Sequence, residues 1–229
     1  MKTLLIFPTL SEASAALKFF GLTPDSNGFA KHDDLGLLIS GMISPRAIKR
    51  VRETAREYSP ETAILCGFCG ACSPSLSLGE LIFCGASPRD AAALESLGAR
   101  RSVIKASKGI ADAVEKRRLF EEDGIDAVDM ESEEFLHVLS ELGCGAGFTQ
   151  VRCVSDTSES RMPTKYFASI SDSETGDIKF SIIKTLKYFI FRPKELADLI
   201  SFLRGAWKAK RRYDYFMLKY LKEISGESP

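Results

Sequence analysis

The sequence of 229 residues has no excess charge of either sign, since 31 Lys and Arg residues balance 31 Asp and Glu residues. A net charge of zero gives no overall electrostatic reason to expect a nucleic-acid partner. The sequence also has only two histidines, His32 and His137, and no Ser-His-Asp triad can be assembled around either. A P-loop motif is absent as well. These absences give no support to triad hydrolases, P-loop proteins or nucleic-acid binding.

Long apolar runs are missing too. No window reaches about 18 consecutive apolar residues, the length that a membrane-spanning helix needs. The apolar run from Thr3 to Phe7 is short and lacks the small-residue cleavage site of a signal peptide. We therefore expect a cytoplasmic protein whose six cysteines are reduced thiols.

Short apolar segments alternate with helix-forming segments, which predicts a largely parallel sheet covered by helices. Ser11 is the expected cap of the first helix. Residues 156–177 form a polar loop and the remainder is helical, so we expect a catalytic domain over 1–177 and a helical, basic extension over 178–229 packed on or beside it. The predicted strands are 3–7, 37–40, 62–66, 78–84, 102–106, 127–130 and 147–154, and the predicted helices are 12–20, 45–58, 88–97, 111–122 and 131–142.

Acidic or Gly-rich segments follow four of the predicted strands. They are Glu12, the segment 67–74, the pair Asp129 and Glu131, and Ser155-Asp156. Ligands of open α/β sheets bind beyond the carboxyl ends of the strands. One such carboxylate alone is more often a helix cap or a surface charge, but four sites on one edge favour a ligand site.

The same segments carry a family resemblance. Residues 64–82, ILCGFCGACSPSLSLGELI, are similar to the pattern TGxAGGLxPxLxxGDxV of the purine nucleoside phosphorylase and methylthioadenosine nucleosidase superfamily. AVDMES at 127–132 resembles its (A)V(E/D)ME(A/S) segment, VRCVSD at 151–156 its VRxxSD segment, and Ser40-Gly41 its SG turn. Order and spacing agree over about residues 1–156. The resemblance implies a three-layer α/β/α fold with a mixed central sheet, a small-molecule nucleoside substrate and a homo-oligomer.

The resemblance also implies roles for individual residues. Asp156, oriented by Ser155, would protonate the leaving purine, and Glu12 would deprotonate the attacking water. Glu131 would hold the ribose hydroxyls and Met130 would pack against the sugar. The other expected substrate-binding residues are Arg152 near the nucleophile, Gly67, Phe68 and Gly70 in a loop that approaches the ligand, and Gly41. Core packing for Met130 and a structural ion pair for Arg152 stay open as alternatives.

The identity of the nucleophile rests on departures from the family pattern. The phosphorylases grip phosphate with a glycine near the N-terminus and an arginine in the third-strand region, whereas this sequence has Phe7-Pro8-Thr9 and Leu65 there. We expect a hydrolase with no metal or organic cofactor; the alternative is a phosphorylase with phosphate as co-substrate. A second alternative is a non-catalytic nucleoside-binding protein, which a pocket blocked by Phe68 would favour.

The cysteines allow a different reading. Cys66, Cys69 and Cys72 have the C-x-x-C-x-x-C spacing of an iron–sulfur or zinc site, with Cys84 as a fourth candidate ligand. The alternative is that small thiols fill buried positions of a Gly-rich segment. We favour the second, because the Gly and Pro positions fit the nucleosidase pattern.

The last quarter of the chain is basic, with 12 Lys or Arg against three acids between residues 179 and 222. The segment 191–200 and the basic aromatic helix after it are similar to the tail of the hopanoid-biosynthesis-associated branch, which implies adenosylhopane, an adenosine with a large apolar 5′ substituent, as substrate. A basic amphipathic helix can lie on an anionic membrane surface, so peripheral contact with the inner membrane through 179–222 is one expectation. Sheet covering, a dimer contact and nucleic-acid binding through this tail are the alternatives.

Overall fold

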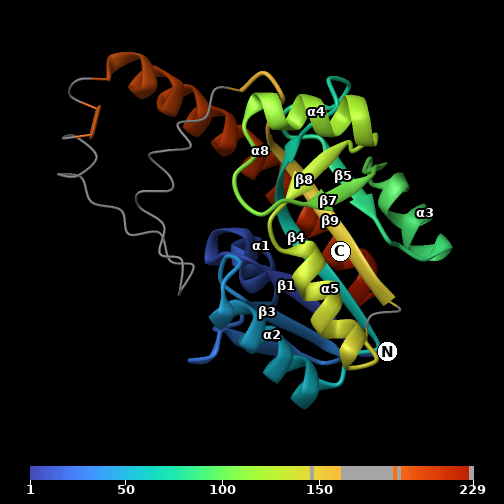
Figure 1. Ribbon diagram of the computed structural model, residues 1–229. Helices are drawn as coiled ribbons and strands as arrows, with labels where there is room; N and C mark the ends of the chain where they lie inside the picture. Colours follow the sequence, from blue (N-terminus) through green and yellow to red (C-terminus); the bar gives the residue numbers. More distant parts are fainter. Residues whose placement is uncertain (145–146, 161–187, 190–191, 227–229) are drawn as a thin grey trace.

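The computed structural model describes residues 1–144, 147–160, 188–189 and 192–226 (Figure 1). Within these residues nine strands form one sheet. The strands are β1 Thr3–Phe7, β2 Phe29–His32, β3 Leu35–Ile39, β4 Thr62–Ala71, β5 Leu81–Cys84, β6 Arg100–Arg101, β7 Ile104–Ala106, β8 Ala127–Asp129 and β9 Phe148–Asp156. The helices are α1 Leu10–Phe20, α2 Pro45–Tyr58, α3 Pro88–Ser96, α4 Ala113–Asp123, α5 Ser132–Glu141 and α8 Pro193–Ser225.

The sheet is mixed, with the strand order β2-β3-β1-β4-β9-β5-β6 and with β8 and β7 added on β4. β1 is parallel to β3 and β4, and β4 is parallel to β9. β2 and β5 run antiparallel to their neighbours β3 and β9. The carboxyl ends of β1, β4 and β9 therefore lie at one edge of the sheet.

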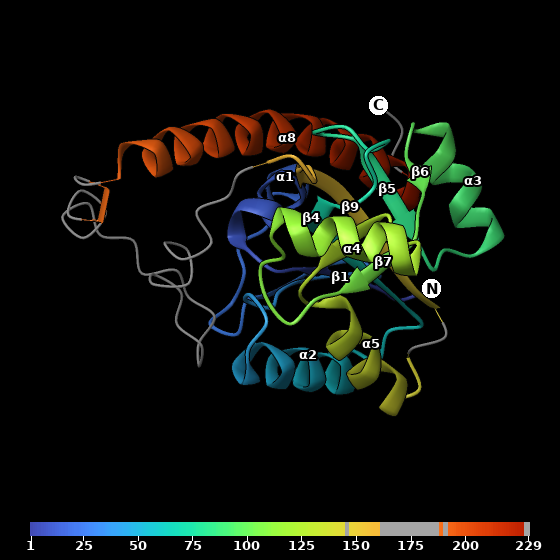
Figure 2. The same ribbon diagram turned by 45° about the horizontal axis from the view of Figure 1, so that its top comes forward.

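Helices cover both faces of the sheet, which confirms the expected three layers. β1 is buried throughout, and its side chains alternate between two cores, as the pleat of a strand requires. Leu5 and Phe7 face the core that α1, α3 and α8 cover. Leu4 and Ile6 face the core that α2 and α5 cover. Figure 2 shows α1 and α8 on one side of the sheet and α2 and α5 on the other.

The starts of the helices follow from capping side chains. The side chains of Ser44 and Ser87 cap α2 and α3, each followed by Pro at the first helical position. The expectation for the first helix was wrong by two residues, because Thr9 and not Ser11 is the N-cap of α1. Thr9 has extended backbone directly after β1, and its hydroxyl oxygen accepts a hydrogen bond from the Glu12 amide at 3.2 Å.

β4 differs most from the expectation. The predicted strand ends at residue 66 and continues as a Gly-rich loop, but the segment through Ala71 is strand. Its pairing with β9 shifts register between Cys69 and Gly70, and Gly70 and Ala71 also pair antiparallel with β8. This irregularity bends the strand and gives it a third partner beside the pocket described below.

Sequence reasoning also missed two strands, the two-residue β6 and the longer β2. β2 includes His32, which is half-buried and stacks on Phe20 with ring centroids 4.6 Å apart. Its four residues follow a Gly-containing turn and show weak apolar alternation, which left little signal.

The C-terminal helix α8 has two different halves. Ala209, Tyr213 and Met217 of its second half are fully buried in the core that α1 and α3 share. Its first turns reach past the rest of the fold (Figures 1 and 2). Residues 179–187 and 190–191 of the expected basic amphipathic segment, and residues 161–177 of the expected polar loop, lie outside the described residues. No helix in the described part of the chain is both long and apolar enough to cross a bilayer.

Candidate active site

A pocket opens where β1, β4, β8 and β9 end. Glu12, Glu131 and Asp156 all line it although they are distant in sequence. The space between the lining residues is about 840 Å³, a volume that includes the open mouth. The fold therefore collects at one place three carboxylates that come from three segments of the chain.

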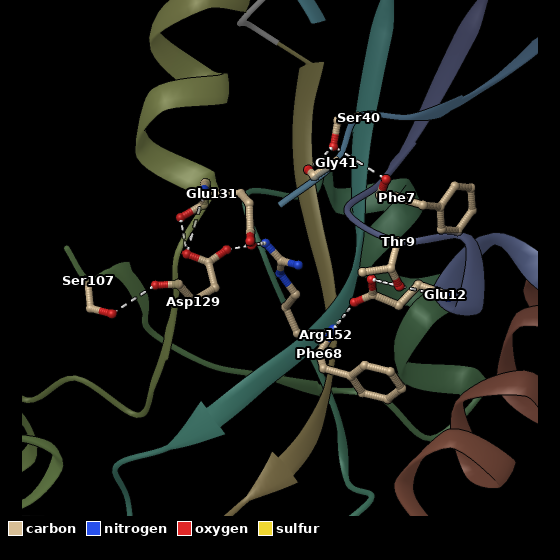
Figure 3. A network of polar contacts seen from close by, with 11 residues as sticks. Phe7, Thr9, Glu12, Ser40, Gly41, Phe68, Ser107, Asp129, Glu131 and Arg152 are labelled. Atoms are coloured by element: carbon tan, nitrogen blue, oxygen red, sulfur yellow. Dashed lines mark hydrogen bonds and ion pairs between the residues drawn. The ribbon is translucent and has the colours of Figure 1, made fainter. Parts of the chain in front are cut away.

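Glu12 lies in the first turn of α1 and is held at both carboxylate oxygens (Figure 3). Oε2 accepts a hydrogen bond from the Thr9 hydroxyl at 2.6 Å, and Oε1 accepts one from the Phe68 amide at 3.0 Å. Gly67 makes room for this arrangement, because a Cβ there would lie 2.4 Å from Glu12 Oε1. Burial raises the pKa of Glu12 despite these hydrogen bonds and the charge of Arg152. A carboxylate with a raised pKa is a stronger base than an exposed one.

Arg152 of β9 stands behind the pocket among three acids (Figure 3). Its side chain is fully buried; Nη2 forms an ion pair with Asp129 and lies 3.4 Å from Glu131 Oε2. Asp129 is held in turn by the Ser132 hydroxyl, which donates to Oδ1 at 2.6 Å. The Nε and Nη1 atoms of Arg152 have no hydrogen-bond partner among the described residues. Since a Cβ on Gly67 would meet both Glu12 Oε1 and Arg152 Nη1, this free donor points toward the Glu12 side.

Glu131 lies at the start of α5 with its carboxylate against Arg152. Burial raises the pKa of Glu131 to about 7, with the charge of Arg152 acting in the opposite direction. The neighbouring carboxylates of Asp129 and Glu12 raise it further. Glu131 can therefore change its protonation state near neutral pH.

Asp156, the last residue of β9, is engaged by two side chains. The Ser155 hydroxyl oxygen lies 2.9 Å from Asp156 Oδ1 and 3.1 Å from the Cys69 carbonyl oxygen. Lys116 of α4 forms an ion pair with Asp156 Oδ2, and both side chains are buried. Gly70 leaves space for this pair, because a Cβ there would lie 2.8 Å from Lys116 Nζ.

The expected substrate-binding residues divide into two groups. Met130, Ser155, Phe68 and Gly70 line the pocket, whereas Arg152, Gly67 and Gly41 do not. Arg152 and Gly67 lie behind Glu12, so Gly67 gives room to side chains rather than to a ligand. Gly41 precedes the pocket residue Met42, and its carbonyl oxygen accepts a hydrogen bond from Ser40 at 2.9 Å.

Phe68 does not close the pocket. Its ring lies toward α8 and packs against Tyr213 with centroids 5.2 Å apart. The backbone amide of Phe68, and not its ring, donates the hydrogen bond to Glu12. The ring thus forms one wall, and this orientation removes the main argument for a blocked, purely binding site.

Sequence reasoning missed Lys116, Ser107 and Phe202, all of which line the pocket. Lys116 stands in the charged run EKRR of α4, where its sequence neighbours are exposed. Phe202 comes from α8, whose approach to the pocket depends on the packing of the whole helix. Asp129 was noted at a strand end, but its pairing with Arg152 follows only from the register of the sheet.

The cysteines were considered as metal ligands. Cys66, Cys69 and Cys72 are free and buried, and burial raises the pKa of each thiol. In the described part of the chain no three His, Cys, Asp or Glu side chains are arranged to bind a metal ion. Cys66 and Cys72 belong to different hydrophobic clusters, where each thiol packs among apolar side chains.

Comparisons with known proteins give the fold. No family model and no curated protein matches the sequence. Solved structures do match: Campylobacter jejuni 5′-methylthioadenosine/S-adenosylhomocysteine nucleosidase has a TM-score of 0.66 at 14% identity, covering 97% of this chain and 99% of that one. This chain has the nucleosidase fold.

Other structures with this nucleosidase fold agree over the same extent. Futalosine hydrolase of Helicobacter pylori has a TM-score of 0.65 at 12% identity, covering 97% of this chain and 98% of that one. The Arabidopsis thaliana 5′-methylthioadenosine nucleosidase has a TM-score of 0.67 at 13% identity, covering 99% and 97%. Because a shared fold does not prove a shared activity, the chemistry must be argued from the pocket.

Proposed function

We propose that this chain is an N-ribosyl hydrolase that cleaves the base–ribose bond of an adenosine-type nucleoside. The observation that carries the proposal is the pocket, whose lining includes a buried carboxylate with a raised pKa, Glu12, and two further carboxylates, Glu131 and Asp156. Cleavage of such a bond passes through an oxocarbenium-like sugar and needs a nucleophile on one side and a protonated leaving group on the other.

Each carboxylate then has one task. Glu12 accepts a proton from the water that attacks C1′, and Arg152, behind the pocket, acts on Glu12 through its charge. Glu131 accepts hydrogen bonds from the two ribose hydroxyls, and Met130 packs against the sugar. Asp156 passes a proton to the departing purine. The C–N bond electrons leave with the base, which is released neutral.

The charges in the pocket favour water over phosphate. Four acids lie in or next to the pocket together with only two cations, Arg152 and Lys116. The acids are Glu12, Asp129, Glu131 and Asp156, and both cations are already paired with carboxylates. A phosphate dianion would meet net negative charge, whereas a neutral water would not. Phosphorolysis remains the alternative, and phosphate dependence of the reaction distinguishes the two.

The proposal is tested by chromatographic detection of free base from adenosine and from 5′-substituted adenosines with short or long apolar tails, with and without phosphate. We expect adenine without phosphate, and a loss of 10²- to 10⁴-fold in kcat/KM for Glu12→Gln and Asp156→Asn. Glu53→Gln, at an exposed carboxylate of α2, is the matched control. Release that requires phosphate would make the protein a phosphorylase. Absence of release from every nucleoside would contradict enzymatic function on this class.

The outer face of α8 supports a substrate with a large apolar 5′ substituent, such as adenosylhopane. Exposed apolar side chains recur there at helical spacing, at Leu196, Ile200, Leu203 and Trp207. Arg204, Lys208 and Arg211 flank them, and the Arg211 guanidinium lies 5.0 Å from the Trp207 ring centroid. Phe202 of the same segment lines the pocket. A basic, apolar helix face beside the pocket fits an anionic bilayer surface that holds such a substrate.

Vesicle sedimentation tests this contact. We expect binding to vesicles of anionic lipid at low salt, release at high salt, and loss of binding in Leu203→Glu/Trp207→Glu. Light scattering of the same samples without lipid measures the oligomeric state, for which a homo-oligomer is proposed. If the wild-type protein does not bind anionic vesicles, and if the double variant forms a smaller oligomer than the wild type, the face instead contacts a second copy of the chain.

A further inference from the structure

A buried lysine is the feature of the pocket that the proposed reaction leaves unexplained. Lys116 is 3% exposed, and its ammonium group is paired with Asp156 at the pocket wall. Removing an ammonium and a carboxylate from water costs several kcal/mol per ion, and an apolar pair of equal volume is often at least as stable. Stability therefore gives no reason for this lysine, and its place beside Asp156 suggests a role in the reaction.

The pair also limits what Asp156 can do alone. The Lys116 ammonium lies against Asp156 Oδ2 and the Ser155 hydroxyl lies against Oδ1, so both carboxylate oxygens are already in contact with hydrogen-bond donors. The leaving base nevertheless needs a proton. Ser155 also contacts Asp156, but a hydroxyl proton is far less acidic than an ammonium proton. The nearest acidic proton thus belongs to Lys116.

We propose that Lys116 is the proton source for the leaving base and acts through Asp156; this rests on the proposed hydrolase function. As the C1′–N bond breaks, its electron pair moves to the purine. The Lys116 ammonium gives a proton to the Asp156 carboxylate, which passes a proton on to the purine nitrogen, and Lys116 becomes an amine. Water adds to C1′ and gives its proton to Glu12. Exchange with solvent then moves one proton from Glu12 back to Lys116, which restores the starting state.

Gly70 and the burial of the pair fit this role. The missing Cβ at Gly70 lets Lys116 reach Asp156 Oδ2 directly, and the low exposure of both side chains keeps solvent from bridging them. A lysine suits this task better than an arginine, because an arginine would pair with the carboxylate equally well but holds its proton at any ordinary pH.

This difference supplies the test. Lys116→Arg keeps the charge, and Lys116→Met/Asp156→Asn removes both charges and avoids a buried unpaired carboxylate. Each is assayed with an adenosine-type substrate and with 4-nitrophenyl β-D-ribofuranoside, whose leaving group needs no proton. Lys105→Met, at an exposed lysine of β7, is the control. Circular dichroism melts show whether each variant is folded.

We expect Lys116→Arg and the double variant to lose 10²- to 10⁴-fold in kcat on the nucleoside, and less than about 10-fold on the nitrophenyl riboside. Equal losses on both substrates would reduce Lys116 to a structural partner. Near-wild-type activity of Lys116→Arg on the nucleoside would overturn the proposal by itself, even if the nitrophenyl compound is a poor substrate. Wild-type protein that cleaves neither substrate refutes the hydrolase function and this inference with it; wild-type cleavage with unaffected variants refutes the inference alone.

Discussion

At the residue scale, the pocket depends on glycines whose missing side chains leave space for buried charged side chains. Gly67→Ala would place a methyl carbon 2.4 Å from Glu12 Oε1 and 2.9 Å from Arg152 Nη1. We expect a loss of at least about 100-fold in kcat/KM, since a displacement of about 1 Å can cost that much. The free energy of unfolding should fall by about 1–3 kcal/mol. Gly109→Ala, where no atom lies within 4 Å of the new Cβ, is the control for unfolding; equal effects of both changes would contradict the steric argument.

The carboxylates of the pocket also predict a pH profile. Glu12 must be ionised to accept a proton, and Glu131 must be ionised to accept two hydrogen bonds. Burial raises the pKa of Glu12, and raises that of Glu131 to about 7. We therefore expect kcat/KM to rise with pH through about 7, with apparent pKa values that belong to the coupled cluster. A profile already flat above pH 5.5 would contradict this. Glu131→Gln should move the acidic limb to lower pH as well as reduce the rate.

The sequence motifs located Glu12, Glu131 and Asp156, because each lies at or shortly after the end of a strand and these strand ends meet at one place. The same reasoning could not find Lys116. Its burial depends on tertiary contacts of its side chain with Asp156 of β9 and with the space left at Gly70 of β4, which sequence periodicity does not contain. Sequence reasoning also could not distinguish a residue that lines the pocket from one that lies behind it. Arg152 and Gly67 were expected to bind substrate, but neither lines the pocket. The catalytic roles remain predictions for the experiments above.

At the scale of elements, α8 belongs to the core through its second half. Tyr213 is fully buried, and its hydroxyl has no hydrogen-bond partner among the described residues. Tyr213→Phe should therefore raise the free energy of unfolding by about 1 kcal/mol, since it removes an unsatisfied polar group. Tyr213→Ala should lower it by about 3–5 kcal/mol, because it leaves a cavity against Phe68 and α1. Denaturant unfolding measures both; a destabilised Tyr213→Phe would show that the hydroxyl is hydrogen-bonded after all.

The prediction of helices and strands succeeded where capping residues and apolar runs determine an element. It failed where the pairing of one strand with another determines it. The bounds of α2 follow from its Ser-Pro start, and β1 from an apolar run that ends at Pro8. By contrast, Gly67 to Ala71 has the composition of a loop and is held as strand by β9 and β8. The first helix was placed two residues late because Thr9 and Ser11 are both good caps, and only the end of β1 determines which is used.

At the scale of the whole molecule, burying Glu131 should make stability depend on pH. Its pKa in the folded state is about 7, above the ordinary value of 4.5. Below pH 4.5 the carboxyl is neutral in both states and imposes no penalty. Between pH 4.5 and 7 the folded state binds more protons than the unfolded state, so stability falls as the pH rises. Above pH 7 the penalty is complete, on the order of 3 kcal/mol.

Glu131→Gln removes this titration and so should gain stability relative to wild type as the pH rises. The melting temperature of the variant minus that of wild type should increase between pH 5 and pH 8 by several degrees, given about 2–4 °C per kcal/mol for a chain of this size. Glu53→Gln, at an exposed carboxylate, should show no comparable increase. A difference that shrinks toward pH 8 would mean that Arg152 stabilises the ionised Glu131 more than burial destabilises it. In that case the acidic limb of the activity profile should also lie well below pH 7, so the two measurements test the same balance independently.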